Sequence, residues 1–258
     1  FIGIDKKYNK YLSFKNFYKI NLNNKSKLDH IIDKNKIKYI IHLAAIPGFV
    51  SCNNFPSNAF ENNVDATFNL MLLAKKYKCK KVIIASSMGV DNFEKNPSIY
   101  GLTKFICEKI CKTFKNLNKT NIVIAKISNV FGLYSHHKSS VVHSFIKNII
   151  KNKALDIHKN GKQSRDFIFA EDVCLKFLKE IYSKNDSDII KINTNKYSTI
   201  LNLKSLLDNI SKKKNTYLFV KTPQGYDDKD YKKKLSKYNK DFIKKLEKTF
   251  NWYMNNRK

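Results

Sequence analysis

Residues 81–104 read KVIIASSMGVDNFEKNPSIYGLTK, and this stretch decides the fold. A short apolar strand is predicted over 81–85, two serines follow it, and a helix is predicted over 98–114. Ser87 lies just past the strand, at the edge where open parallel sheets place their ligands. Tyr100 and Lys104 are four residues apart on the predicted helix, so their side chains share one face. The stretch therefore indicates a strand–helix unit with polar groups at its ligand-binding end.

Tyr100 and Lys104 are candidates for proton transfer. A free tyrosine has a pKa of ~10 and is a poor base at neutral pH. Because a neighbouring ammonium favours the phenolate, we expect Lys104 to lower the pKa of Tyr100. The alternative is an ordinary surface pair of tyrosine and lysine, since Y-x-x-x-K alone is a weak signal. Its place one helix after the strand-end Ser87 favours the catalytic interpretation.

The same alternation of strands and helices extends through the first half of the chain. Further strands are expected at 1–4, 17–22, 39–43 and 121–127, and helices at 26–34 and 57–77. The helix at 57–77 is expected to bury one stripe, formed by Phe60, Val64, Phe68, Met71 and Leu72. After Gly132 we expect helices at 141–151, 171–182 and 201–212, strands near 155–158 and 189–193, and a helical end to the lysine-rich segment 229–258. This order predicts βαβ crossovers and a parallel sheet.

Composition limits the classes of protein that fit. The 258 residues are 42% hydrophobic, enough for one large domain or two small ones, and their formal net charge is +29. Nearly all basic residues are lysines spread along the whole chain, so we expect compositional bias and no specific nucleic-acid partner, with a true polyanion surface as the alternative. No apolar run approaches the ~18 residues of a membrane span. Five cysteines without C-x-x-C predict neither a disulfide framework nor a metal site, so a cytoplasmic location is expected.

The sequence resembles the extended short-chain dehydrogenase/reductase superfamily, specifically the NAD-dependent nucleotide-sugar epimerase/dehydratase group that includes UDP-glucose and UDP-glucuronate 4-epimerases. Besides 81–104, the matching segments are FIGID (1–5), YIIHLAA (39–45), ENNVDAT (61–67), SNVFG (128–132) and GKQSRDF (161–167). The resemblance covers about residues 1–180. It implies an α/β fold, a Rossmann-like doubly wound parallel sheet with a smaller C-terminal α/β substrate-binding region. The implied domains are an NAD-binding domain over 1–132 and a mainly substrate-binding region over 133–258, of which some segments return to the first domain.

The resemblance also implies roles for individual residues. Tyr100 would be the acid/base on the sugar hydroxyl, Ser87 would hydrogen-bond the same oxygen, and Lys104 would bind the nicotinamide ribose. Asn129 and Arg165 would hold the diphosphate of a nucleotide sugar. The expected NAD-binding residues are Asp5, Asn21, Leu22, Leu43, Ala44, Ala45, Asn63, Tyr100 and Lys104. A homodimer is implied as well, through the helices at 57–77 and 98–116.

Some of these residues have competing structural interpretations. Arg165 could form a structural ion pair, and Asp5 could cap a turn. Other polar and thiol groups near the motifs are expected to be structural: Cys107 and Cys111 as buried thiols, His136 and His137 as solvated loop residues, and Asp172 at the start of a helix.

The chain also departs from the family. The family's first strand and its G-x-x-G-x-x-G turn have no counterpart, so we expect a fragment lacking about 25–30 upstream residues. Strands 1–4 and 39–43 would then lack their shared neighbour. Met88-Gly89 stands where 4,6-dehydratases have an acidic pair, which argues against dehydration. Residues 222–227 are expected to match a substrate segment without its arginine, and Cys52 stands where many epimerases have serine.

The leading expectation is an NAD-dependent nucleotide-sugar epimerase, which inverts C4 of a UDP-sugar through a 4-keto intermediate. A reductase, decarboxylase or dehydratase acting on nucleotide sugars with the same scaffold is the first alternative. A non-catalytic truncated remnant or a basic binding protein is the second.

Overall fold

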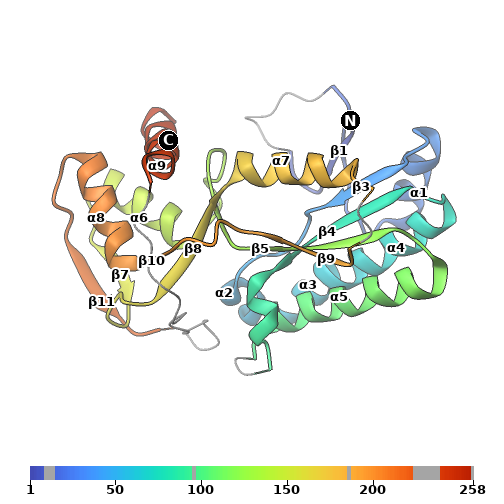
Figure 1. The fold of residues 1–258 in the computed structure, drawn as a ribbon, viewed down its shortest axis with the longest axis horizontal. Coiled ribbons are helices and arrows are strands. Elements are labelled where there is room, and N and C mark those ends of the chain that lie inside the picture. Colours follow the sequence, from blue (N-terminus) through green and yellow to red (C-terminus); the bar gives the residue numbers. More distant parts are fainter. Residues whose placement is uncertain (9–14, 95–96, 185–186, 223–238, 257–258) are drawn as a thin grey trace. The chain divides into compact units, whose positions relative to one another are not determined.

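The structure is a computed structural model, and it describes residues 1–8, 15–94, 97–184, 187–222 and 239–256 (Figure 1). The chain forms two compact units. The first unit comprises Phe1–Ile127 and Phe177–Lys191, and the second comprises Ser128–Lys176 and Ile192–Lys258. The chain therefore leaves the first unit after Ile127, returns within helix α7 (Ala170–Ile181), and leaves again after Lys191.

The described part of the first unit contains two sheets. Four strands lie in the order β3-β4-β5-β9, and a separate parallel pair is formed by β1 and β2. The bounds are β1 Gly3–Asp5, β2 Phe17–Lys19, β3 Tyr39–His42, β4 Lys81–Ser87, β5 Ile122–Ile127 and β9 Ile189–Ile192. β3, β4 and β5 pair in parallel, as predicted.

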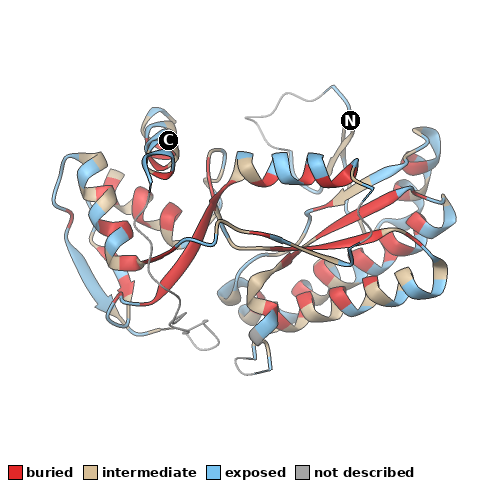
Figure 2. Cartoon of the chain, in the orientation of Figure 1, coloured by how far each residue is buried: buried red, intermediate tan, exposed pale blue. Residues whose placement is uncertain are grey.

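Burial explains the unbroken apolar sequences of the central strands. Val82, Ile83 and Ile84 of β4 are at most 2% exposed, and the opposing residues of β5 are equally buried. Figure 1 shows helices α4 (Ala66–Lys76) and α5 (Ile99–Asn118) on one side of this sheet and α7 on the other, while α1 (Lys25–Lys34) also belongs to the first unit. Because both faces are covered, the strands carry continuous β-branched runs instead of alternating polar residues (Figure 2).

The expected single helix over 57–77 is wrong in detail. The segment consists of α3 (Pro56–Phe60), one turn of π-helix (Glu61–Asp65) and α4. A π turn holds more residues than an α turn, so the apolar spacing of 3.6 cannot continue through it in phase. Met71 is fully buried, whereas Phe68 and Leu72 are 43% and 40% exposed, contrary to the expected buried stripe.

The residues of the second unit that the structure describes also form two sheets. One has the order β10-β8-β6, and the other pairs β11 with β7 in parallel. The strand bounds are β6 Asn129–Phe131, β7 Leu155–His158, β8 Ser164–Phe169, β10 Tyr197–Thr199 and β11 Tyr217–Val220. The helices of this unit, besides part of α7, are α6 (Val141–Ile150), α8 (Ile200–Ser211) and α9 (Lys240–Asn255).

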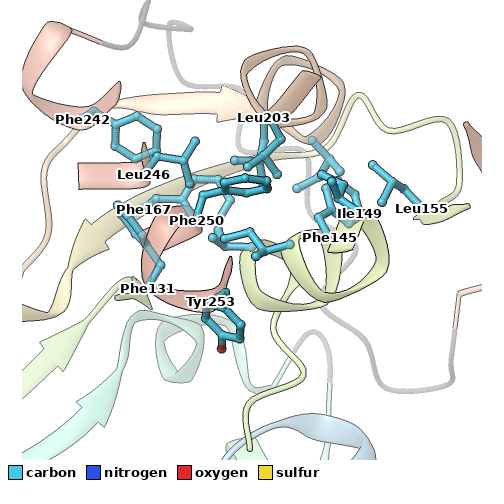
Figure 3. Packing of buried hydrophobic residues seen from close by; sticks show 14 of the residues in the cluster. Phe131, Phe145, Ile149, Leu155, Phe167, Leu203, Phe242, Leu246, Phe250 and Tyr253 are labelled. Carbon is cyan, nitrogen blue, oxygen red and sulfur yellow. The ribbon is translucent and has the colours of Figure 1, made fainter. Parts of the chain in front are cut away.

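The core of the second unit is built around aromatic side chains (Figure 3). Helix α9 contributes Phe242, Leu246, Phe250 and Tyr253, whose spacing places them on one face of the helix. Phe131 of β6 meets the ring of Phe242 at a centroid distance of 5.3 Å. The helical end expected for the lysine-rich segment is thus confirmed, and packing of one apolar face holds it against the unit.

The mixed α/β class with parallel strands is as expected. Among the described residues, no helix is both long enough and apolar enough to cross a bilayer.

Candidate active site

Ser87 and Tyr100 meet at the carboxyl end of β4. The Ser98 hydroxyl caps α5 by accepting the Gly101 N–H at 3.0 Å, and this places Tyr100 in the first turn. The Ser87 hydroxyl oxygen accepts the Gly89 N–H at 3.1 Å and also hydrogen-bonds Tyr100. The hydrogen bond from Ser87 lowers the pKa of Tyr100, which is the effect of a hydroxyl that donates to the phenol oxygen. The result is an oriented chain from the Gly89 amide through Ser87 to Tyr100.

The expected lowering of the Tyr100 pKa does not hold in this structure. Burial raises the pKa of Tyr100 above 10, and the Ser87 hydrogen bond opposes this only in part. Lys104 is 8% exposed, and its ammonium donates to the carbonyl oxygen of Ala85 at 2.9 Å. Burial also lowers the pKa of Lys104. The ammonium is thus held at the strand end by a backbone carbonyl.

A short helix that the sequence did not predict supports this site. Helix α2 (Phe49–Asn54) carries Phe49, whose ring meets that of Tyr100 edge-on at a centroid distance of 5.5 Å. The Asn53 side-chain oxygen accepts the Ile99 N–H at 3.1 Å and so holds the start of α5. Six residues are too few to display a helical apolar period, and for this reason the segment gave no signal.

Asn63 ties three parts of the first unit together. It lies in the π turn with 1% exposure, and its side chain accepts the Ile46 N–H at 2.7 Å and donates to the Ile46 carbonyl oxygen at 3.2 Å. It also donates to Thr103 Oγ1 at 3.1 Å, and Thr103 in turn donates to the carbonyl oxygen of Tyr100 at 2.9 Å. The loop after β3 is therefore connected to the helix that carries Tyr100.

A second buried chain lies beside the first. The Thr67 hydroxyl donates to the Asn63 carbonyl oxygen at 2.6 Å, and His42 Nε2 lies 3.1 Å from the Thr67 oxygen. Burial, with Lys104 nearby, lowers the pKa of His42 to about 3, so the ring is neutral at pH 7. His42 and Thr67 both lie in the motif segments quoted above, but the sequence did not show that the two segments meet.

The other residues expected to bind NAD lie at the ends of β1, β2 and β3. The exposed Asp5 carboxylate accepts the Lys7 N–H at 2.8 Å, the turn-capping contact of the alternative interpretation. Asn21 is exposed and accepts the Asn23 N–H at 3.1 Å. The remaining members of this set are a half-buried Leu22, the exposed Leu43 and Ala44, and a half-buried Ala45.

These groups fit two ends of a dinucleotide. The Asp5 carboxylate is a group that can accept from ribose hydroxyls and the Asn21 amide one that can hydrogen-bond an adenine, while Lys104 and Tyr100 offer an ammonium and a phenol at another strand end of the same unit. The exposed Leu43 and Ala44 supply apolar surface beyond β3. No residue of this set is suited to a pyrophosphate, and we assign none.

Asn129 and Arg165 lie in the second unit. The exposed Asn129 donates to the Asp166 carbonyl oxygen at 3.0 Å, and Arg165 is 7% exposed and donates to the Ser164 carbonyl oxygen at 2.8 Å. Asn129 pairs with Phe167 across parallel strands, so Arg165, two residues earlier, projects from the same face as Asn129.

The structural expectations have mixed outcomes. Cys107 and Cys111 are buried thiols, as expected. His136 is not a solvated loop residue, because its ring lies 4.6 Å from that of Trp252, whereas His137 is exposed. Asp172 lies in the first turn of α7 and pairs with Lys245 at 2.8 Å. Cys52 is buried, and residues 223–227 of the expected substrate segment lie outside the described residues.

The described parts of the chain contain no group of three or more histidine, cysteine, aspartate or glutamate side chains arranged to hold a metal ion.

Comparison with known proteins gives consistent matches. Residues 1–192 match the family model described as NAD dependent epimerase/dehydratase family. UDP-glucuronate 4-epimerase of Thermodesulfobacterium geofontis is 29% identical over 168 residues, covering 61% of this chain and 52% of that protein. The chain spans about half the length of the curated relatives it matches.

Solved structures share the fold. UDP-glucose 4-epimerase of Thermotoga maritima, crystallised with UDP-glucose, superposes with a TM-score of 0.87 at 20% identity, covering 100% of this chain and 91% of that one. UDP-glucuronic acid 4-epimerase of Bacillus cereus, in complex with UDP-glucuronic acid and NAD, gives 0.80 at 23% identity, with 93% and 81% covered. These likenesses establish a Rossmann-like α/β fold.

Proposed function

The chain belongs to the NAD-dependent epimerase/dehydratase family, and on that premise we propose that it is an NAD-dependent nucleotide-sugar epimerase acting at C4 of a UDP-sugar. The observation that carries the proposal is the oriented contact from the Gly89 amide through Ser87 to the hydroxyl of the half-buried Tyr100. A protein that only bound a sugar would not need a phenol aligned by a serine at the end of a central strand.

Tyr100 would accept the proton of the sugar C4 hydroxyl while C4 is oxidised, and would return it once C4 has been reduced from the other face. The sugar is thereby a 4-keto compound between the two proton transfers. Ser87 would hydrogen-bond the same oxygen and, through its contact with Tyr100, oppose the rise that burial causes in the tyrosine pKa. When bound, NAD supplies the nicotinamide that takes up and gives back hydride.

Lys104 and Asn63 would serve the cofactor side of the reaction. The ammonium of Lys104, held at Ala85, would contact ribose hydroxyls and place positive charge near Tyr100. Asn63 would keep the loop after β3 in the shape that NAD requires, since it satisfies both backbone groups of Ile46. Asp5 would accept from the adenosine ribose.

We assign the diphosphate of the substrate to Asn129 and Arg165. The guanidinium is a planar fork that suits phosphate oxygens, and Arg165 is one of two arginines in a lysine-rich chain. Anchoring the diphosphate leaves the sugar free to turn over between oxidation and reduction.

A homodimer and a cytoplasmic location complete the proposal. Phe68 and Leu72 of α4 and Leu117 of α5 are 43%, 40% and 77% exposed, an apolar surface that a second copy of the chain would cover. Sedimentation of the protein reports whether the chain pairs. Four of the five cysteines are buried thiols, which suits a reducing compartment.

The decisive experiment is Tyr100→Phe in the complete protein, which removes the phenol and keeps the ring. We expect interconversion of a UDP-sugar and its C4 epimer, followed by NMR of the products, to fall at least 100-fold while NAD remains bound. Lys115→Met, on the same helix, is the control and should leave the rate unchanged. Near-normal epimerisation by Tyr100→Phe would refute the acid/base role, and net oxidation of NADPH by a 4-keto sugar would favour a reductase.

A further inference from the structure

Three buried polar residues, Ser86, Glu108 and Lys126, and the exposed Asp91 lie around Ser87 and take no part in the mechanism above. The Ser86 hydroxyl donates to Glu108 Oε1 at 2.5 Å, and Lys126 Nζ lies 3.3 Å from Glu108 Oε2. Lys126 also forms an ion pair with Asp91. Ser86 and Glu108 are each 6% exposed and Lys126 is 8% exposed. Every member of this set, here called the Glu108 network, has a charged or hydroxyl partner.

The network contacts the chain immediately before and shortly after Ser87. Ser86 directly precedes Ser87, and Asp91 belongs to the 3₁₀ turn Met88–Asn92 that directly follows it. Lys126 lies on β5 in register with Ser86. Glu108 is one turn beyond Lys104 and two turns beyond Tyr100 on α5, so the same helix carries the network's carboxylate and the catalytic pair.

Stability alone is a poor explanation for this arrangement. Burying a carboxylate and an ammonium costs desolvation that their attraction repays only with good geometry, and apolar replacements of such pairs are often equally stable. What a buried pair adds is a defined relative position of the elements that carry it. Here those elements are the end of β4, which presents Ser87, and α5, which presents Tyr100.

We propose that Glu108 is a positioning residue that sets the Ser87–Tyr100 contact by fixing Ser86 and Lys126 to helix α5. The consequence for turnover depends on the proposed function, but the consequence for the tyrosine does not. If Ser86 is released, Ser87 moves from its place and Tyr100 loses the hydrogen bond that opposes the rise of its pKa.

Two variants test this without changing charge. Ser86→Ala removes the hydroxyl that Glu108 holds, and Glu108→Asp keeps the carboxylate but draws it back by one methylene. Neither variant alters the net charge, and Ser86→Ala neither adds, removes nor shortens a charged side chain, so a shift in the Tyr100 pKa in Ser86→Ala reports the position of Ser87. Ser87→Ala sets the full size of the effect.

The chain supplies a matched control. Lys81 and Glu180 form a second buried pair in the same unit, 3.2 Å apart with side chains 3% and 11% exposed, against 10% and 7% for Lys126 and Glu108. Lys81 donates to the carbonyl oxygens of Glu180 and Ser183, so Glu180→Asp weakens a comparable ion pair at another place in the unit.

The readout is ¹⁹F NMR of protein labelled with 3-fluorotyrosine, whose lower pKa brings the titration into a pH range where proteins stay folded. Tyr100→Phe identifies the resonance among the 14 tyrosines. We expect Ser86→Ala and Glu108→Asp to raise the Tyr100 pKa by about 0.5–1 unit, the size of one hydrogen bond, and Glu180→Asp to leave it unchanged. In the epimerase assay kcat should fall about 3- to 10-fold with KM within twofold.

An unchanged Tyr100 pKa in Ser86→Ala, or an equal shift in Glu180→Asp, overturns the positioning role. Should Glu108→Asp fail to fold, Ser86→Ala alone decides. If no UDP-sugar is epimerised, the proposed function fails while the ¹⁹F titration still decides this inference.

Discussion

Replacing Asn63 by alanine is the sharpest test of how the site is held together. The side chain makes three hydrogen bonds, two to the backbone of Ile46 and one to Thr103. Alanine keeps the helical backbone but removes all three. The Ile46 N–H then has no side-chain partner in the loop after β3, and Thr103 loses its link to the π turn.

The cost follows from those contacts. A net hydrogen bond contributes about 0.5–1.5 kcal/mol, and an orphaned polar group adds to the loss, so three bonds correspond to about 2–4 kcal/mol. At 1.4 kcal/mol for each factor of ten, the opening equilibrium of the loop rises roughly 30- to 1000-fold.

Amide hydrogen exchange measured by NMR reports the opening equilibrium of this loop directly. We expect the Ile46 N–H to lose protection by that factor in Asn63→Ala and to keep it in Asn62→Ala. Asn62 is the matched neighbour: it bonds to Asn58 and Lys6 and does not reach the loop. Exchange of the Ile46 amide within threefold of wild type in Asn63→Ala would show that Asn63 does not hold the loop.

Two further predictions concern pH and backbone conformation. His42 has a folded pKa of about 3 against 6.5 ordinarily, so the unfolded state binds more protons between these values. The free energy of unfolding should therefore decrease as pH falls from 6.5, by up to about 1.4 kcal/mol per pH unit. His42→Gln should make the free energy of unfolding depend less on pH. The measurement is a urea titration at several pH values, in which amide hydrogen exchange reports the unfolding of the first unit. Gly161 has φ +70°, and an added Cβ would lie 2.8 Å from Leu201 Cγ, so Gly161→Ala should destabilise the second unit by about 2–4 kcal/mol. Fluorescence of Trp252, the single tryptophan, reports that loss of stability. Gly48 has φ +86°, but an added Cβ would have no atom within 4 Å, so Gly48→Ala should destabilise the first unit by only about 1–2 kcal/mol. Amide hydrogen exchange in the first unit measures this smaller loss.

Long elements with one apolar period could be predicted from sequence. Helices α5, α6 and α8 and strands β3, β4 and β5 lie within a few residues of their expected places, because in each the burial pattern agrees with the local period. Strands β6, β8 and β10 were not predicted. β8 is buried at every position although it contains Ser164, Arg165 and Asp166, and the partners of Asp166 come from a distant segment. Asp166, for example, accepts from the amides of Thr194 and Asn195 at 3.1 and 2.7 Å.

The residues of the candidate site could likewise be predicted from sequence only in part. Tyr100, Lys104 and Ser87 could be named because one helical spacing and one strand end identify them. The contacts of Phe49, Thr103 and Glu108 could not, because each depends on the approach of segments far apart in the chain. The direction of the Tyr100 pKa shift was wrong for a related reason: spacing shows that a lysine is near, but not that its ammonium is bound to a backbone carbonyl.

The two crossings of the chain between its units have a practical consequence for dissecting the protein. No single break in the polypeptide frees either unit intact. Ending the chain at Ile127 would strip β5 of its neighbour β9 and leave the buried Lys81 ammonium without Glu180. Dividing the molecule for separate expression therefore calls for grafting Phe177–Lys191 back onto the first unit through a designed linker, and rejoining Lys176 to Ile192 in the second.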